Sequence, residues 1–176
     1  MKRLSAFALS HSPVLSFDPA FALFAKHPRK ELGRKLVLIP RTNSGSTFFG
    51  EVAKKMTEGF TDVRVLLMQP EAAERRVGER LCRLCGAKTT VVELASVQQF
   101  LDEVSAASEV LSQRYHGALA AFAMGITAMA VPQETGDKMD SLNGLMRKAS
   151  ARDELLQSVK RGADGLRQAI RSVSSL

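Results

Sequence analysis

The sequence has few of the residues and motifs on which several common functions depend. It contains no tryptophan, one tyrosine and 6% aromatic residues in all, so it offers no row of aromatic side chains on which the bases of single-stranded nucleic acids could stack. No apolar run approaches the roughly 20 residues that a membrane-spanning helix requires. The glycine-rich spacing of a Walker phosphate-binding loop is also missing. Nucleic-acid binding and membrane insertion are therefore not expected.

Cysteine is equally scarce. Cys82 and Cys85 form a single C-x-x-C pair, and no second pair of ligands stands at the spacing that a zinc site needs. Both cysteines fall late in a helical pattern, whereas a redox pair is expected directly after a strand. We therefore expect two ordinary helix residues, no metal site and no bound cofactor.

The amino terminus lacks the features of a signal peptide. Its start is basic, but the apolar middle is interrupted at residues 10–13, Ser-His-Ser-Pro, and no small-x-small cleavage site follows. The net charge of +7 suits an anionic partner such as a phosphate, a nucleic acid or a membrane surface. The basic residues are scattered, which ranks nucleic acid last. We expect a cytoplasmic protein, and contact with the inner membrane surface stays open.

Apolar runs and turn residues alternate along the chain in a βαβαβαβαβ pattern. The expected strands are 36–39, 63–68, 88–94, 110–111 and 126–131. The helix after the first strand is expected to bury Phe49, Val52, Ala53 and Met56, and the helix after Ser96 to bury Val97, Phe100, Leu101 and Val104. Strands separated by helices of this length form a parallel sheet with right-handed crossovers. The predicted fold class is α/β, a Rossmann-like parallel sheet of about five strands with helices on both faces, plus carboxyl-terminal helices.

The length of 176 residues favours one compact domain. We expect residues 1–35 to be an irregular segment and linker, residues 36–149 to form the Rossmann-like domain, and residues 150–176 to form an amphipathic helix packed on it. From residue 147 onward, seven Lys or Arg residues oppose three Asp or Glu residues. The basic face of this helix is either solvated or in contact with an anionic membrane surface.

The stretch from Glu109 to Met129 contains the most informative pattern. A short apolar strand is followed by Arg114-Tyr115-His116-Gly117 and then by a helix of small residues. The pattern therefore places a cation and an imidazole where a strand gives way to a helix. In open α/β sheets ligands bind at the carboxyl ends of strands, and the first turn of a helix offers free N–H groups to an anion.

These residues resemble a known family. The run SQRYHGALAAFAMGITAMAV, followed by DKMDSL, is similar to the carboxyl-terminal domain of the polysaccharide pyruvyl transferases. The signature of that domain is Arg-x-His at a strand end, an Ala-rich helix, Gly, a strand and a downstream Lys. Asp18-Pro19 resembles the segment that enters this domain, and Pro40-Arg41 resembles the end of its first strand. Thr127 stands where the family usually has proline.

The resemblance implies phosphoenolpyruvate as the donor for forming a pyruvate ketal on a glycan or lipid-linked sugar. Arg114 and Arg41 would hold the carboxylate and the phosphate, and His116 would protonate the methylene carbon. Gly117 would let the backbone approach the phosphate, with Lys138 as a further phosphate contact and Ser44 in a hydroxyl-rich loop beside it. Asp18 is expected to cap a turn or span the domain junction.

The resemblance reaches only one half of a two-domain enzyme of the GT-B type, in which two Rossmann-like halves enclose a cleft. Three explanations for the missing half stay open: a partner chain supplies it, the chain is a shortened product, or the domain does not catalyse a reaction. Self-association is expected if an apolar cleft wall is exposed. Two alternatives remain beside the pyruvyl transferase. One is the nucleotide-sugar-binding half of a glycosyltransferase, and the other is an interaction domain without catalysis.

Overall fold

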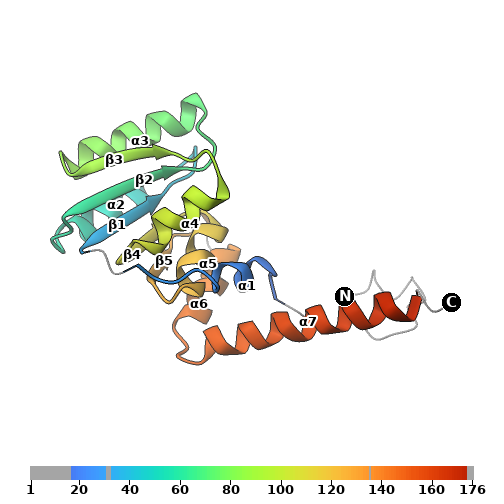
Figure 1. Ribbon diagram of the computed structural model, residues 1–176. Coiled ribbons are helices and arrows are strands. Elements are labelled where there is room, and N and C mark those ends of the chain that lie inside the picture. The colour runs from blue at the N-terminus through green and yellow to red at the C-terminus, as the bar shows by residue number, and fades with distance from the viewer. Residues whose placement is uncertain (1–16, 31–32, 135, 174–176) are drawn as a thin grey trace.

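The computed structural model describes residues 17–30, 33–134 and 136–173 (Figure 1). Five parallel strands form a single sheet in the order β3-β2-β1-β4-β5. The strands are β1 (Lys35–Ile39), β2 (Asp62–Leu67), β3 (Thr89–Glu93), β4 (Glu109–Ser112) and β5 (Thr127–Ala130). The predicted parallel sheet of about five strands is confirmed.

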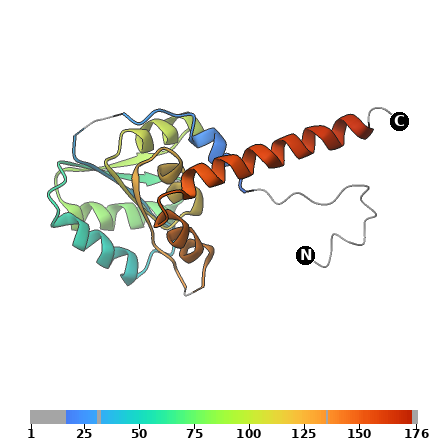
Figure 2. The same cartoon turned by 90° about the horizontal axis from the view of Figure 1, so that it is seen from below.

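Helices cover both faces of the sheet (Figures 1 and 2). They are α1 (Ala20–Phe24), α2 (Ser46–Met56), α3 (Ala72–Cys85), α4 (Val97–Ser105), α5 (Tyr115–Ala123), α6 (Lys138–Met146) and α7 (Ala151–Val173). One hydrophobic cluster joins α2 and α3 to one face, and a larger cluster joins α1, α4, α5, α6 and the start of α7 to the other. The inner strands β1, β2 and β4 are largely buried on both faces, as continuous apolar runs predict, whereas the edge strands β3 and β5 are partly exposed.

The chain changes direction across the sheet between β1 and β4. From β1 it proceeds to β2 and β3 on one side, and it then returns to pair β4 with the other side of β1, with Ile39 opposite Ser112. The loops that leave β1 and β4 therefore diverge at the carboxyl ends of two neighbouring strands. Such a switch point is where open α/β sheets bind their ligands.

Two helix faces differ from the prediction. In α2 the fully buried side chains are Phe48 and Val52, whereas Ala53 is exposed. Phe49 is half-buried, and the guanidinium of Arg80 lies 4.4 Å from its ring centroid. With two adjacent phenylalanines, the apolar pattern fits two helix phases that differ by one residue. In α4, Val97 is 63% exposed because it directly follows the capping residue, before the helix turns its apolar face to the sheet.

The segment expected to be irregular, residues 1–35, contains the short helix α1. Phe21 is fully buried and Phe24 is 6% exposed. Their rings meet Phe122 of α5 and Phe100 of α4 at centroid distances of 5.7 and 6.2 Å. Residues 1–16 and 31–32 lie outside the described part of the chain. Helix α1 therefore belongs to the core, whereas residues 26–30 are mostly exposed, as expected of a linker.

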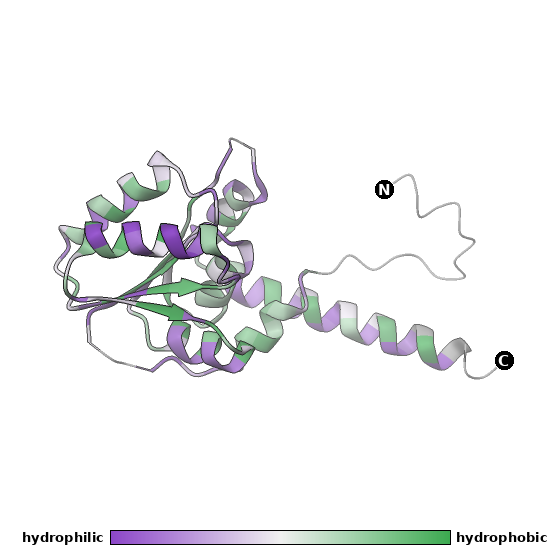
Figure 3. Cartoon of the chain, turned by 90° about the horizontal axis from the view of Figure 1, so that it is seen from above, coloured by the Kyte–Doolittle hydropathy of each residue, from purple (hydrophilic) through white to green (hydrophobic). Residues whose placement is uncertain are grey.

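Helix α7 packs on the domain only along its first turns. Ala151 and Val159 are 1% and 7% exposed, whereas Leu166 and Ile170 are 63% and 57% exposed. Figures 1 and 3 show the second half of α7 extending beyond the sheet and its covering helices. The expected packing of this helix on the domain is therefore found only at the start of α7. Among the helices of the described residues, none is long and apolar enough to span a membrane.

The two cysteines lie at the end of α3 as free thiols. Burial raises the pKa of the Cys85 thiol to about 11, and burial also raises the pKa of Cys82. A raised pKa disfavours the thiolate, which is the form that reacts and binds metals. The prediction of two ordinary helix residues is consistent with these surroundings.

Candidate functional site

A cavity of about 200 Å³ opens at the carboxyl ends of β1, β2 and β4. Its lining comes from the loop after β1, the junction between β4 and α5, and the start of α6. Four of the residues singled out in the sequence line it together: Arg41, Arg114, His116 and Lys138. The remaining lining residues are Met68, Gln113, Tyr115, Asp137 and Met139. Segments that are far apart in the sequence thus bring their cationic side chains to one cavity.

Arg114 is held by three neighbouring elements. Its Nε donates to the carbonyl oxygen of Pro40 at 3.1 Å, and its Nη2 lies 2.5 Å from Oε1 of Glu74. Both terminal nitrogens also lie within 3.5 Å of Oε1 of Gln69. The side chain is 17% exposed. Arg114 therefore joins the ends of β1 and β2 to α3, and the part of its guanidinium that a ligand can reach is small.

Glu74 is the counter-charge of Arg114, and its side chain is fully buried. Its second oxygen, Oε2, accepts a hydrogen bond from the backbone N–H of Gln69 at 2.6 Å. The sequence pattern did not single out Glu74, because α3 carries several acidic residues and nothing in their spacing marks the one that turns inward. Its position in the first turn of α3 also suits a carboxylate, since this end of a helix is electropositive.

His116 projects from the first turn of α5 and is 54% exposed. Its Nε2 lies 3.1 Å from Oδ2 of Asp18, so with the carboxylate ionised Nε2–H is the donor. The other carboxylate oxygen of Asp18 accepts from the backbone N–H of Ala20 at 3.0 Å. Asp18 therefore caps the turn before α1, as the sequence predicted, and it also contacts a candidate site residue, which the sequence did not predict.

Tyr115 separates His116 from Lys138 in the wall of the cavity. Its ring meets the His116 ring edge to face at 5.5 Å, and the Lys138 Nζ lies 4.7 Å from its centroid. Burial, with a smaller contribution from the nearby charge of Asp18, raises the pKa of the Tyr115 hydroxyl. The phenol therefore stays neutral at physiological pH.

Arg41 is exposed at the cavity rim. Two arginines are among the described residues that line the cavity. Arg114 forms an ion pair with Glu74, whereas Arg41 has no ion-pair partner in the described part of the chain. The loop that carries it is fixed through its backbone, because the Arg41 N–H donates to Oγ of Ser44 at 3.0 Å. Arg41 thus combines a held backbone with an available cationic side chain.

Ser44 does not line the cavity, contrary to its predicted role beside the phosphate. It is 7% exposed, and its hydroxyl lies within hydrogen-bond distance of the Arg41 carbonyl oxygen, at 2.9 Å, and of Oε1 of Gln113. These contacts occupy the hydroxyl within the protein. Ser44 ties the loop after β1 to the end of β4 and so positions Arg41.

Gly117 is buried against the sheet and is absent from the cavity lining. A Cβ at this position would lie 2.7 Å from Cδ1 of Ile39, and closer still to the hydroxyl of Ser112. The Ser112 hydroxyl in turn donates to the Arg114 carbonyl at 2.8 Å. The need for glycine therefore comes from close packing of α5 on β1 and β4, whereas the prediction was a close approach of the backbone to the phosphate.

The electrostatics of the cavity favour an anion. The lining contains three cationic side chains, those of Arg41, Arg114 and Lys138, and one carboxylate, that of Asp137. The excess of positive charge is reduced by Glu74 and Asp18, which contact Arg114 and His116. The first residues of α5 and α6 also line the cavity. The opening turn of a helix presents N–H groups without intrahelical partners and carries a partial positive charge. The arrangement can therefore bind a small phosphate or carboxylate.

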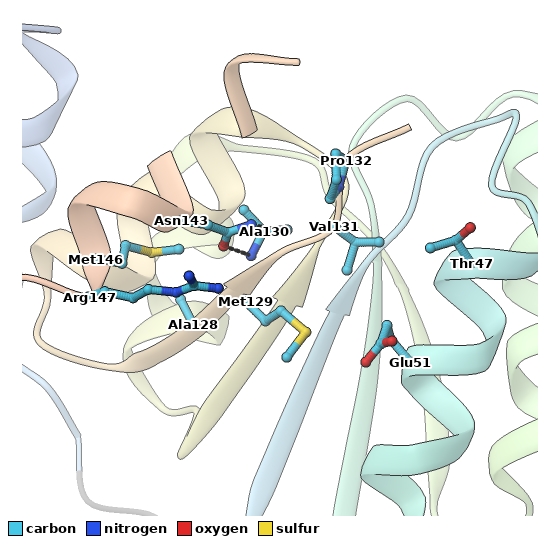
Figure 4. Close-up of a pocket in the computed structure, with 10 residues that line it drawn as sticks. All are labelled: Thr47, Glu51, Ala128, Met129, Ala130, Val131, Pro132, Asn143, Met146 and Arg147. Carbon is cyan, nitrogen blue, oxygen red and sulfur yellow. Dashed lines mark hydrogen bonds between the residues drawn. The ribbon is translucent and has the colours of Figure 1, made fainter. Parts of the chain in front are cut away.

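A larger hollow of about 420 Å³ follows the outer edge of β5 between α2 and α6 (Figure 4). There the side-chain amide of Asn143 pairs with the backbone of Ala130, with N–O distances of 3.1 and 2.6 Å, and so takes the place of a neighbouring strand. Glu51 and Arg147 line opposite sides of this hollow (Figure 4). Because no group of like charges converges there, the smaller cationic cavity is the stronger candidate site.

No protein-family model matches the sequence, and no curated protein sequence matches it. A proposed UDP-N-acetylglucosamine 2-epimerase from Listeria monocytogenes superposes with a TM-score of 0.57 at 15% sequence identity, over 96% of this chain and 56% of that protein. The carboxyl-terminal domain of a glycosyl transferase group 1 family protein from Francisella tularensis gives a TM-score of 0.39 at 14% identity, over 87% of this chain and 94% of that domain, and this weaker match supports no conclusion.

The first of these likenesses shows the fold alone, because its sequence identity is low. The chain has a fold consistent with one half of the GT-B fold, and it spans about half the length of the Listeria protein. The predicted fold class is therefore confirmed, including its likeness to a GT-B half.

Proposed function

We propose that this domain binds phosphoenolpyruvate as the donor-binding half of a pyruvyl transferase that forms ketals on a cell-surface glycan or its lipid-linked precursor. The observation that supports this proposal best is the convergence of four candidate residues, Arg41, Arg114, His116 and Lys138, on one cavity. Cationic side chains and two helix starts suit a ligand that carries both a phosphate and a carboxylate.

The size of the cavity also favours a small donor. Its volume of about 200 Å³ lies below the roughly 300–1,000 Å³ that is typical of pockets for larger organic ligands. Tyr115 is the aromatic side chain among the described lining residues, and Lys138 covers its ring. Lys138 would therefore compete with a nucleotide base for that face of the Tyr115 ring.

The residues can be given roles in a balanced reaction. His116 in its protonated form transfers a proton to the methylene carbon of phosphoenolpyruvate, and the electron pair of the carbon–carbon double bond forms the new C–H bond. Two hydroxyl groups of one sugar then bond to the neighbouring carbon, whose bond to the phosphate oxygen breaks. One hydroxyl proton restores His116 and the other leaves with the phosphate. Arg41 and Lys138 stabilise the departing phosphate through its negative charge.

A complete reaction needs a second half to hold the acceptor, since the proposed enzyme closes a cleft between two domains. We propose that a partner chain or a further domain supplies it. The second candidate is a domain that binds a nucleotide sugar. It has the support of the fold likeness to a proposed UDP-N-acetylglucosamine 2-epimerase.

Calorimetry on the full chain separates these candidates. Phosphoenolpyruvate is expected to bind, and Arg41→Ala is expected to weaken binding about ten- to hundredfold, which corresponds to the roughly 1.5–3 kcal/mol of a charge-assisted hydrogen bond. Arg76→Ala serves as the matched control, because Arg76 is also exposed but lies on α3 outside the cavity. Binding of uridine diphosphate without binding of phosphoenolpyruvate would favour the nucleotide-sugar candidate. Binding of neither would favour an interaction domain.

A further inference from the structure

Asp18 occupies a fixed position beside the candidate site. Its Oδ1 accepts from the Ala20 N–H at 3.0 Å, and its backbone carbonyl accepts from the Phe21 N–H at 3.0 Å. Phe21 is fully buried, and its ring lies 5.7 Å from that of Phe122 in α5. Because α5 also carries His116, the packing of α1 on α5 fixes the aspartate relative to the imidazole.

The contact between Asp18 and His116 has little value as a stabilising ion pair. The two side chains are 26% and 54% exposed, and exposed pairs contribute little to folding. Its consequence is local. An ionised Asp18 accepts a hydrogen bond from Nε2 at 3.1 Å, so it keeps a proton on Nε2 and restrains the rotation of the ring. Nδ1 then becomes the nitrogen that is left for a ligand.

We infer that Asp18 is a positioning residue that fixes the orientation of His116 and the ring nitrogen with which it exchanges protons. This inference rests on the proposed function, in which His116 gives a proton to the donor. An aspartate that orients a histidine through one nitrogen while the other performs proton transfer is a recurrent arrangement in enzymes.

The inference can be tested on the ligand-free full chain by nuclear magnetic resonance. Long-range proton–nitrogen spectra show which nitrogen of a neutral imidazole carries the proton, and His116→Gln assigns the signals. At a pH that leaves the ring neutral, the wild type is expected to show a protonated Nε2 and a bare Nδ1. In Asp18→Asn the amide oxygen can still accept from the Ala20 N–H, but the amide NH2 then faces Nε2 and can only donate to it. The proton should therefore move to Nδ1, and the shifts of the two nitrogens should exchange.

Asp164→Asn is the control, because Asp164 also forms an ion pair, 2.9 Å from Arg167 on α7, which is more exposed than the pair of Asp18 and His116. It should leave the His116 spectrum unchanged. If each nitrogen of His116 had the same chemical shift in Asp18→Asn as in the wild type, the inference would be overturned.

Phosphoenolpyruvate titrations of the same variants separate this inference from the proposed function. Asp18→Asn should bind the donor within a few fold of the wild type, since it removes a negative charge and no ligand contact. If the wild type bound no phosphoenolpyruvate, the proposed function would fail while the tautomer result stood. If it bound the donor but Asp18→Asn left the tautomer unchanged, only the role of Asp18 would fail.

Discussion

Replacing Arg114 by alanine should lower the free energy of unfolding, whatever its effect on ligand binding. The substitution removes the partner of Glu74, whose carboxylate is fully buried. It also removes the hydrogen bond to the Pro40 carbonyl. Breaking one side of a buried ion pair typically costs about 3–5 kcal/mol, because the remaining charge is left without compensation. We expect a loss of unfolding free energy in this range.

Urea unfolding followed by circular dichroism measures this loss directly. For a chain of this size, about 1 kcal/mol shifts the melting temperature by roughly 2–4 °C, so a fall of roughly 6–20 °C is expected in a thermal scan of Arg114→Ala. The m-value should stay constant if only stability changes. A loss below about 1 kcal/mol, at the level of an ordinary surface substitution, would refute the role given to Glu74.

The cause can be isolated with a second substitution. Glu74→Gln in the Arg114→Ala background removes the stranded charge, while the amide oxygen can still accept from the Gln69 N–H. The double variant should therefore be more stable than Arg114→Ala alone. The pair interaction follows from the double-mutant cycle with both single variants. If Glu74→Gln gave no recovery, the instability of Arg114→Ala would have another origin.

Three further predictions follow from the packing and the charges. Gly117→Ala should lower the unfolding free energy by about 1–3 kcal/mol through overpacking against Ser112, which urea titration measures; an unchanged midpoint would refute the proposed close packing. The pKa of Cys85 is raised to about 11 from 9.0, so the stability that its thiol contributes is present below about pH 9 and is lost as the pH rises towards 11; unfolding titrations should show a slope there that Cys85→Ala reduces, and equal slopes would contradict the assignment. Residues 160–173 of α7 carry four cations and one acid, so the chain should sediment with phosphatidylglycerol vesicles at low salt and release when glutamate replaces these cations; equal sedimentation of both proteins would exclude this contact.

The sheet could be predicted because its inner strands β1, β2 and β4 are largely buried on both faces, and such strands appear in the sequence as apolar runs between turn residues. The grouping of Arg41 with Arg114 and His116 was accessible for a related reason. Each of these side chains follows a predicted strand, and the carboxyl ends of parallel strands lie at one edge of a sheet. Helix phase was less accessible. In α2, consecutive Phe48 and Phe49 fit two phases equally well, and the tertiary packing of α2 on the sheet decides between them.

The two counter-charges of the site, Glu74 and Asp18, could not be predicted from the sequence, because their positions depend on the order of the strands and on which face of a helix turns inward. Arg114 and Glu74 are 40 residues apart, and His116 and Asp18 are 98 residues apart. Arg114 meets Glu74 only because β4 pairs with β1 and not with β3. An alternating strand and helix pattern is compatible with several strand orders, and each order would give the same arginine a different neighbour.

These two carboxylates change which cation should dominate binding. Arg114 and His116 already contact a counter-charge in the absence of a ligand, so an anion must share or displace that partner to gain their full attraction. Among the described lining residues Arg41 and Lys138 form no ion pair, and the Lys138 Nζ lies 4.7 Å from the centroid of the Tyr115 ring. The motif that identified the site therefore should not supply most of its affinity. In the proposed function, Arg41 and Lys138 should therefore anchor the anion, whereas Arg114 should maintain the shape of the cavity and His116 should transfer the proton.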